Sequence, residues 1–341
     1  MSTTPFPLAV SLGDPAGVGP EIITASYARM RSDWRSQTFF VVGGVEVLKN
    51  AAEACGADCP VVPIAQPDEA PMAFHAGLPV LAGLDVPYTP GKPTRLGAQL
   101  ALTSLEWATR FAVRAEASGM VTAPIAKAGL MEVGFEFPGQ TEFLASACGL
   151  SPEDAVMMLA GPSLRAVPLT VHIALADVPL KLSSDLIANK TRIVAKALQW
   201  DFGVGNPRLA IAGLNPHSGE NGQFGDEETR IIQPAIDVLR GEGFNVTGPV
   251  PGDALFTPRM RETYDAALCM YHDQALIPLK ALEFDEGVNV TLGLPIIRTS
   301  PDHGTAFDIA GQGTADPSAM CAAIRMAGTC AKARAAASAH A

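Results

Sequence analysis

The sequence predicts an α/β protein with two α/β/α domains, and three observations support this fold class. Strand-like apolar runs alternate with helix-like segments along the whole chain, which is typical of a largely parallel sheet. A length of 341 residues favours two domains. Apolar residues make up 48% of the chain and charged residues only 17%, which excludes a disordered protein and indicates well-filled cores.

The expected strands are short apolar runs bounded by glycine, proline or polar residues. They cover residues 8–12, 39–43, 119–123, 166–171, 208–214 and 264–271. The expected helices carry apolar residues near helical spacing. They cover residues 20–30, 45–55, 96–118, 185–200, 227–242 and the alanine-rich segment after Pro317. Residues 60–95 are rich in proline and glycine, so only short extended pieces and turns are expected there.

The charge distribution argues against a nucleic-acid partner. There are 24 basic and 35 acidic residues, and no basic stripe interleaved with aromatic residues occurs in the sequence. An anionic substrate would therefore have to meet local cations in a pocket. The first residues lack a basic stretch followed by a long apolar run, so we expect a cytoplasmic protein with no membrane partner.

Three of the six histidines lie after predicted strands, each in its own loop motif. They are His172 in Thr-Val-His, His217 in Asn-Pro-His-Ser-Gly-Glu-Asn-Gly, and His272 in Met-Tyr-His-Asp-Gln. Open α/β sheets bind ligands at the carboxyl ends of their strands, and three imidazoles with an open position are typical of a catalytic metal site. Any one of them is equally compatible with a structural loop histidine, but three together favour metal binding.

Three glycine-containing segments are candidate ligand loops. Residues 13–21 lie between a predicted strand and a helix. The exposed N–H groups at the helix start could bind an anion, or the segment could be only a tight turn. Gln140 and Thr141 lie at the start of another predicted helix. This helix start could bind an anion, or the Thr141 hydroxyl could simply cap the helix. Small residues surround His303 and Asp308, which predicts backbone wrapped closely around a ligand.

Two cations lie in apolar segments near the C-terminal third of the chain. Lys280 follows Ile-Pro-Leu, Arg298 follows Leu-Pro-Ile-Ile, and Asn289 lies between them. If buried, such cations need an anionic partner, which could be a substrate carboxylate or phosphate. The alternative is a structural ion pair with Asp285 or Glu286.

Six motifs occur in a fixed order along the chain. They are Gly-Asp-Pro-Ala-Gly-Val-Gly-Pro-Glu, Thr-Ala-Pro-Ile-Ala-Lys, Pro-Gly-Gln-Thr-Glu, Asn-Pro-His-Ser-Gly-Glu-Asn-Gly, Tyr-His-Asp-Gln-Ala-Leu-Ile-Pro-Leu-Lys and Asp-His-Gly-Thr-Ala-Phe-Asp-Ile-Ala-Gly. With this combination the sequence resembles the 4-hydroxythreonine-4-phosphate dehydrogenase family of vitamin B6 biosynthesis, over about residues 8–317. The resemblance implies an isocitrate/isopropylmalate dehydrogenase-like fold, with a cleft between two domains. We expect residues 1–130 plus 283–341 to form the cofactor-side domain, and residues 131–282 to form the metal-binding and dimerisation domain.

The resemblance also implies ligands for the metal and the substrate. His172, His217 and His272 would bind a divalent metal, with zinc, magnesium and cobalt as candidates, at a site shared across a homodimer. The partners would be a small phosphorylated substrate and a second copy of the chain. Substrate contacts are implied for Gln140, Thr141, Lys280, Asn289 and Arg298.

Cofactor and catalytic residues follow from the same resemblance. Related isopropylmalate dehydrogenases bind the adenosine end of NAD with a loop similar to residues 303–311 here. The expected contacts to NAD or NADP are therefore His303, Gly304 and Asp308. Lys280 and Asp273 are the candidate catalytic residues.

The implied reaction is NAD(P)-dependent oxidation of 4-phosphooxy-L-threonine (4-hydroxythreonine 4-phosphate) to a β-keto acid. Loss of CO2 from that acid would yield 3-amino-2-oxopropyl phosphate. The family usually has histidine where this chain has Gln140, a neutral side chain that can still donate a hydrogen bond. Alternatives are a dehydrogenase of a phosphorylated four-carbon sugar acid (4-phosphothreonate or 4-phosphoerythronate) and, from another class, a phosphate acyltransferase-like enzyme.

Overall fold

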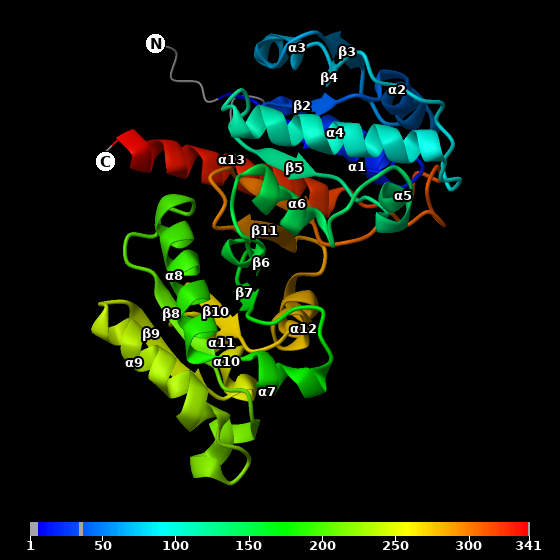
Figure 1. Cartoon of the computed structure of the whole chain (residues 1–341). Coiled ribbons are helices and arrows are strands. Elements are labelled where there is room, and N and C mark those ends of the chain that lie inside the picture. The colour runs from blue at the N-terminus through cyan, green and yellow to red at the C-terminus, as the bar shows by residue number, and fades with distance from the viewer. Residues whose placement is uncertain (1–5, 34–36, 340–341) are drawn as a thin grey trace. The chain divides into compact units, whose positions relative to one another are not determined.

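The computed structural model describes residues 6–33 and 37–339 (Figure 1). The chain forms two compact units, each made of helices around a sheet. Unit 1 comprises Met1–Pro152 and Leu294–Ala335, and unit 2 comprises Glu153–Gly293 and Ala336–Ala341. The chain therefore leaves unit 1, builds most of unit 2 and returns to unit 1.

Unit 1 contains a parallel sheet of buried strands. Its strand order is β3 (Val61–Ile64), β4 (Leu78–Leu81), β2 (Phe39–Val42), β1 (Leu8–Ser11), β5 (Met120–Thr122), β12 (Arg298–Pro301). Every pairing between these neighbours is parallel. The central strands β1 and β2 are fully buried, which is expected for a parallel sheet covered by helices on both faces.

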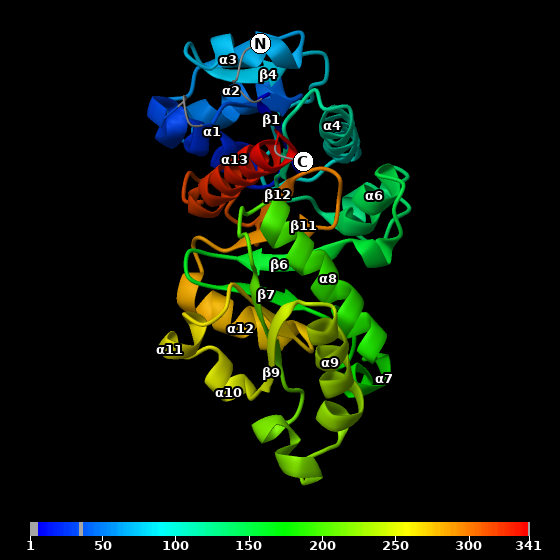
Figure 2. The same ribbon diagram turned by 90° about the vertical axis from the view of Figure 1, so that its left-hand side faces the viewer.

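Helices cover both faces of the unit 1 sheet. They are α1 (Gly19–Met30), α2 (Val45–Ala54), α3 (Ala70–Ala73), α4 (Arg95–Val113), α5 (Lys127–Glu132), α6 (Gln140–Ala147) and α13 (Ser318–Ala339). Figure 2 shows α4 on one side of the strands and α1 with α13 on the other. The Thr94 hydroxyl caps the start of α4 by accepting from the Gly97 N–H at 3.0 Å.

Unit 2 contains a mixed sheet. Its strand order is β11 (Val288–Leu292), β6 (Val156–Ala160), β7 (Arg165–Pro168), β10 (Ala266–Cys269), β8 (Arg208–Ala212), β9 (Asn245–Val250). Strand β6 runs antiparallel to both β11 and β7, whereas β7, β10, β8 and β9 run parallel to one another. The parallel half of this sheet is the part that carries the candidate site.

The helices of unit 2 also lie on both faces of its sheet. They are α7 (Val178–Lys181), α8 (Ser184–Trp200), α9 (Gln233–Gly241), α10 (Gly252–Leu255), α11 (Pro258–Arg261) and α12 (His272–Glu283). A π-helical turn over Glu228–Ile232 leads into α9. In Figure 2, α8 and α9 lie on one side of the strands, and α10, α11 and α12 on the other.

The predicted α/β class is confirmed, and most predicted elements are present. The helix predicted over 96–118 is wrong at its end, because α4 stops at Val113 and Ala115 adopts a left-handed conformation with φ of 56°. No glycine marks this end in the sequence, so the usual stop signal is missing. In the described part of the chain, no helix is long and apolar enough to cross a membrane.

The unit boundaries differ from the expected positions at 130/131 and 282/283. Residues 131–152 belong to unit 1, where Gln140 of α6 contacts Arg298 of β12. Residues 283–293 belong to unit 2, because β11 pairs along its whole length with β6. Both shifts follow from long-range contacts that local sequence patterns do not reveal.

Replacement of Leu255 tests the assignment of the hydrophobic core of unit 2. It is fully buried in a cluster that includes Leu159, Leu276 and Leu279. Leu255→Ala should lower the free energy of unfolding by about 2–5 kcal/mol, because it leaves a cavity in a packed core. Chemical denaturation followed by circular dichroism measures this loss. Val238→Ala, at a position on α9 that is 50% exposed, is the control. An equal effect of both changes would contradict this assignment of the core.

Candidate functional site

Three neighbouring parallel strands bring the three histidine segments to one edge of unit 2. Strand β10 pairs in parallel with β7 on one side and with β8 on the other. His172 follows β7, His272 follows β10 and His217 follows β8. Parallel strands end at the same edge of a sheet, so His172 and His272 lie at one edge although they are 100 residues apart in sequence. This edge is where α/β sheets bind ligands.

Polar side chains connect these strand ends. The Thr170 hydroxyl donates to the Met270 carbonyl at 2.7 Å, which joins the His172 segment to the His272 segment. The Gln274 amide accepts from the Met270 N–H at 2.7 Å and donates to the Gly213 carbonyl at 2.8 Å. Gln274 therefore bridges the ends of β10 and β8. The sequence assigned no role to Thr170 or Gln274, and the only available signal was their position two residues from a candidate histidine.

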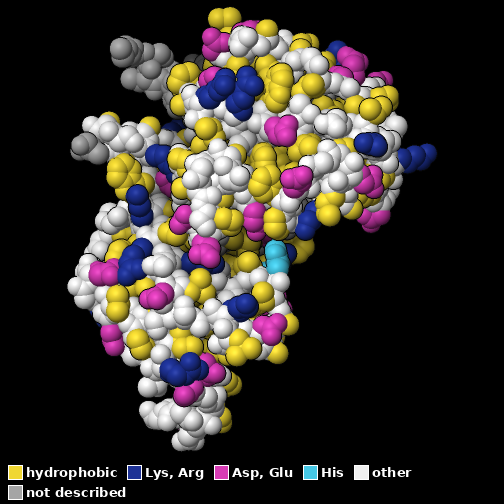
Figure 3. Space-filling view, in the orientation of Figure 1, with side chains coloured by type: hydrophobic (Ala, Val, Ile, Leu, Met, Phe, Trp, Pro, Cys, Tyr) yellow, Lys and Arg dark blue, Asp and Glu magenta, His cyan; other side chains and the backbone are white. Residues whose placement is uncertain are grey.

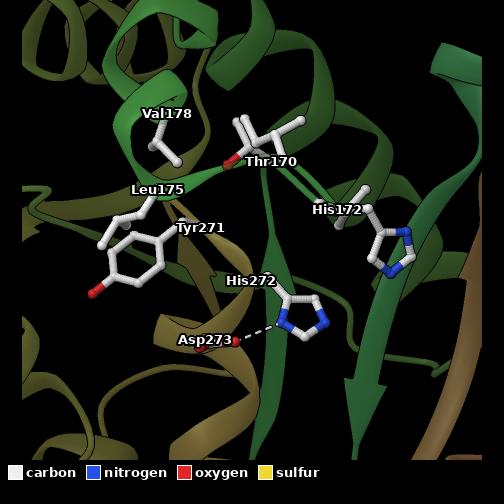
Figure 4. Close-up of a pocket in the computed structure, with 9 residues that line it drawn as sticks. Thr170, His172, Leu175, Val178, Tyr271, His272 and Asp273 are labelled. Atoms are coloured by element: carbon white, nitrogen blue, oxygen red, sulfur yellow. Dashed lines mark hydrogen bonds and ion pairs between the residues drawn. The ribbon is translucent and has the colours of Figure 1, made fainter.

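His172 and His272 lie close together beside a pocket of about 240 Å³ (Figure 4). Their ring centroids are 5.7 Å apart. The other side chains labelled in the close-up are Thr170, Leu175, Val178, Tyr271 and Asp273. His172 has φ of 48°, a left-handed conformation that is uncommon for a residue other than glycine and is often found at functional sites.

Carboxylates engage the Nδ1 atoms of two of the histidines. Asp273 Oδ1 lies 2.7 Å from His272 Nδ1, and Glu220 Oε2 lies 3.0 Å from His217 Nδ1. A carboxylate on Nδ1 fixes the tautomer and orientation of the ring and leaves Nε2 as the metal-binding nitrogen. In the structure Asp273 thus contacts His272 directly, while Glu220 was not predicted from the sequence.

The chemistry of these donors fits a divalent metal. Two exposed imidazoles carry the oriented Nε2 atoms that a catalytic zinc-type site needs. Within residues 6–33 and 37–339, however, no group of three or more His, Cys, Asp or Glu side chains is arranged to hold a metal ion. The structure brings His172 and His272 together, and it leaves His217 separate from them.

A second candidate region lies in unit 1, around Arg298 of β12. Arg298 is 5% exposed, and its Nη2 donates to Thr122 Oγ1 at 2.7 Å and to Gln140 Oε1 at 3.1 Å. Burial lowers the pKa of Arg298 to about 10, so the guanidinium remains protonated at neutral pH. A buried cation beside neutral oxygen acceptors suits an anionic ligand group. Thr122 was not predicted as a site residue.

The start of α6, beside Arg298, is not capped by Thr141, which was one of the two sequence interpretations of this segment. Helix α6 begins at Gln140 with Gly139 as its N-cap, and Thr141 is the second helical residue. The interpretation of Thr141 as the helix cap is therefore wrong. The Gln140 oxygen is already engaged by Arg298, so its amide NH2 is the part that can donate to a ligand.

Lys280 and Asn289 belong to unit 2. Lys280 lies near the end of α12 and is exposed, so the argument that a buried cation needs an anionic partner applies to Arg298 and not to Lys280. Asn289 lies on β11 opposite Leu159 of β6 and is half-buried. Substrate contacts from these two residues remain predictions.

The glycine segments of unit 1 pack against each other. The Val18 N–H donates to the Thr305 carbonyl at 2.9 Å, and a Cβ on Gly17 would lie 2.7 Å from the same oxygen. The Gly311 N–H donates to Glu21, a buried carboxylate on α1. The loop of residues 302–313 is therefore anchored on the strand-to-helix turn of residues 13–21.

The predicted cofactor residues lie on the surface of this anchored loop. His303, Gly304 and Asp308 are exposed, and His303 Nδ1 lies 3.0 Å from the Gly304 carbonyl oxygen. The exposed Asp308 carboxylate is available to accept hydrogen bonds from a ligand hydroxyl. Basic and acidic side chains are interspersed on the face shown in Figure 3, so this face carries no large patch of one charge.

Comparison with known proteins agrees with the motifs. The family model of the pyridoxal phosphate biosynthetic protein PdxA matches residues 35–327. A protein from Erythrobacter litoralis named 4-hydroxythreonine-4-phosphate dehydrogenase is 63% identical over 96% of this chain and 98% of its own length. A protein of the same name from Zymomonas mobilis is 51% identical over 94% of each chain.

A solved structure supports the same relationship. The crystal structure of 4-hydroxythreonine-4-phosphate dehydrogenase from Klebsiella pneumoniae matches with a TM-score of 0.82 at 35% identity. The match covers 96% of this chain and 99% of that one. These findings confirm the resemblance inferred from the six motifs, and the chain belongs to the family of the pyridoxal phosphate biosynthetic protein PdxA.

Proposed function

We propose that this protein is a metal- and NAD(P)-dependent 4-hydroxythreonine-4-phosphate dehydrogenase. The reaction would oxidise the C3 hydroxyl of 4-phosphooxy-L-threonine, with the hydride passing to the nicotinamide and the hydroxyl proton to a base. The resulting β-keto acid would lose CO2 to yield 3-amino-2-oxopropyl phosphate. The arrangement of three histidine segments at the ends of β7, β10 and β8 is the observation that carries the proposal.

The metal would be held by the Nε2 atoms of His172, His217 and His272. A bound divalent metal would act as a Lewis acid that lowers the pKa of a coordinated hydroxyl. Asp273 and Glu220 would keep the rings of His272 and His217 in the required orientation. Zinc, magnesium and cobalt are all candidates, although imidazole donors favour zinc or cobalt over magnesium.

The substrate's anionic groups would be bound by cationic side chains. In unit 1, Arg298 would bind such a group together with the Gln140 amide and the Thr141 hydroxyl. In unit 2, the exposed Lys280 ammonium and the Asn289 amide would supply further contacts. Lys280 is the proposed catalytic group, and Asp273 would act through its bond to His272.

The anchored loop of residues 302–313 would hold NAD or NADP, which supplies the hydride acceptor. His303 and Gly304 would contact the nucleotide, and the Asp308 carboxylate would accept from a ribose hydroxyl. The bonds to Val18 and Glu21 support this role, because they fix the loop before a ligand arrives.

The protein would act as a homodimer whose two copies complete the metal site. The family resemblance implies this shared site. In the described residues of one chain, His217 is not grouped with His172 and His272. Apolar side chains near the pocket support an interface there. Leu175 is 67% exposed and Leu180 is 81% exposed, and both follow His172 closely in sequence.

The metal assignment is tested by His217→Ala. We expect loss of turnover and a lower metal content measured by atomic emission, because too few protein ligands remain. Circular dichroism should show an unchanged fold. His75→Ala, which removes an exposed histidine of unit 1, should retain both metal and activity. Full activity of His217→Ala after treatment with a chelator would refute the metal assignment.

The substrate assignment is tested by Gln140→Ala. A hydrogen bond to a charged group contributes about 1.5–3 kcal/mol, so KM for the phosphorylated substrate should rise roughly ten- to hundredfold. Gln140→His should be tolerated, because imidazole can also donate to an anion. Gln199→Ala, an exposed position on α8, is the control. An unchanged KM with a lower melting temperature would show that Gln140 has only a structural role.

The dimer is tested by light scattering at assay concentration. We expect twice the mass of the 35.5 kDa chain, because a site that needs ligands from two copies makes assembly a condition for activity. A catalytically active monomer would contradict the shared site.

A further inference from the structure

The loop that carries His217 has an unusual backbone that other residues must hold in place. His217, Ser218, Glu220 and Asn221 have φ values between 41° and 56°, and Gly219 between them has φ of 79°. A left-handed conformation is unfavourable for residues other than glycine, and it persists only where the surrounding structure enforces it. Some group near this loop must therefore compensate for the strain.

Glu228 is the group that holds the beginning of this loop. Its Oε1 accepts from the Leu214 N–H at 2.8 Å and from the Asn215 N–H at 2.7 Å. Its Oε2 accepts from the Asn215 side-chain amide at 2.9 Å. Glu228 is only 4% exposed, and a buried carboxylate is stable there because several donors converge on it.

The loop also packs directly against this carboxylate. A Cβ on Gly219 would lie 2.8 Å from Glu228 Oε2 and 2.9 Å from the Gly225 carbonyl oxygen. Glu228 therefore contacts this loop twice. It accepts hydrogen bonds at the beginning of the loop, and it packs against Gly219 in the middle. Glu220, in the same left-handed run, reaches His217 Nδ1 only because the backbone curls in this way.

We propose that Glu228 is a positioning residue for the His217 imidazole. It acts through the main chain: its carboxylate fixes the Leu214–Asn215 segment, this segment sets the left-handed turn, and the turn presents His217 with Nδ1 bonded to Glu220. This inference rests on the proposed role of His217 as a metal ligand. Neither the motif pattern nor the family resemblance assigned a role to Glu228.

The test compares Glu228→Ala and Glu228→Gln with the unaltered dimeric protein. Alanine removes all three bonds. Glutamine keeps one acceptor oxygen for the two main-chain N–H groups, but its NH2 would face the NH2 of Asn215, so the third bond is lost. Asp226→Asn is the matched control, because Asp226 lies two residues away, is exposed and pairs with Arg230.

The probe is Co²⁺ added to metal-free protein, with its affinity measured by chelator competition and its coordination by visible absorption. Loss of groups that orient metal ligands typically lowers affinity about 10- to 100-fold. We expect a loss in this range for Glu228→Ala with an altered absorption band, a smaller loss for Glu228→Gln, and no change for Asp226→Asn. If Glu228→Ala does not fold, Glu228→Gln decides the question alone.

Two further outcomes separate this inference from the proposed function. A lower melting temperature of both Glu228 variants, with unchanged Co²⁺ affinity and spectrum, would show a purely structural role and overturn the inference. His217→Ala serves as the reference in the same titration. If it weakens Co²⁺ binding and the Glu228 variants do not, only the positioning role fails. If His217→Ala itself binds Co²⁺ normally, the proposed metal site fails first.

Discussion

The parallel pairing of β10 with β7 and β8 is the constraint on which the candidate site depends. It places three loops from distant parts of the chain at one sheet edge. Thr170 and Gln274 then join the three strand ends through hydrogen bonds of 2.7–2.8 Å. Side chains on packed strand ends are positioned more rigidly than side chains on free loops, which is what a catalytic site requires.

In unit 1, two glycine-containing segments that are distant in sequence are likewise held together. The turn of residues 13–21 leaves room for the backbone of residues 302–313, and Glu21 secures that loop from a buried position. Buried carboxylates thus have similar tasks in both units. Glu21 accepts the Gly311 N–H, and Glu228 accepts the N–H groups of Leu214 and Asn215. Each carboxylate thus holds a loop that carries proposed ligand-binding residues.

The sequence predicted the parts of the site that depend on local patterns. Strand-end histidines, the buried Arg298 and the α/β class follow from apolar runs and the residues that end them. Thr122, Gln274 and Glu228 were not predicted. Each forms a hydrogen bond with a residue at least 14 positions away, and only the fold brings the two residues together. The exposure of Lys280 could not be read from the sequence for a related reason, since apolar neighbours in sequence do not tell which face of a helix a residue occupies.

The most direct test of the shared metal site is anomalous scattering from crystals of the cobalt-loaded protein. The proposed site predicts one strong peak per active site, about 2.0–2.2 Å from the Nε2 atoms of His172, His217 and His272, with ligands drawn from two copies of the chain. A peak bound by His172 and His272 without His217, or a metal held elsewhere, would contradict the proposed centre.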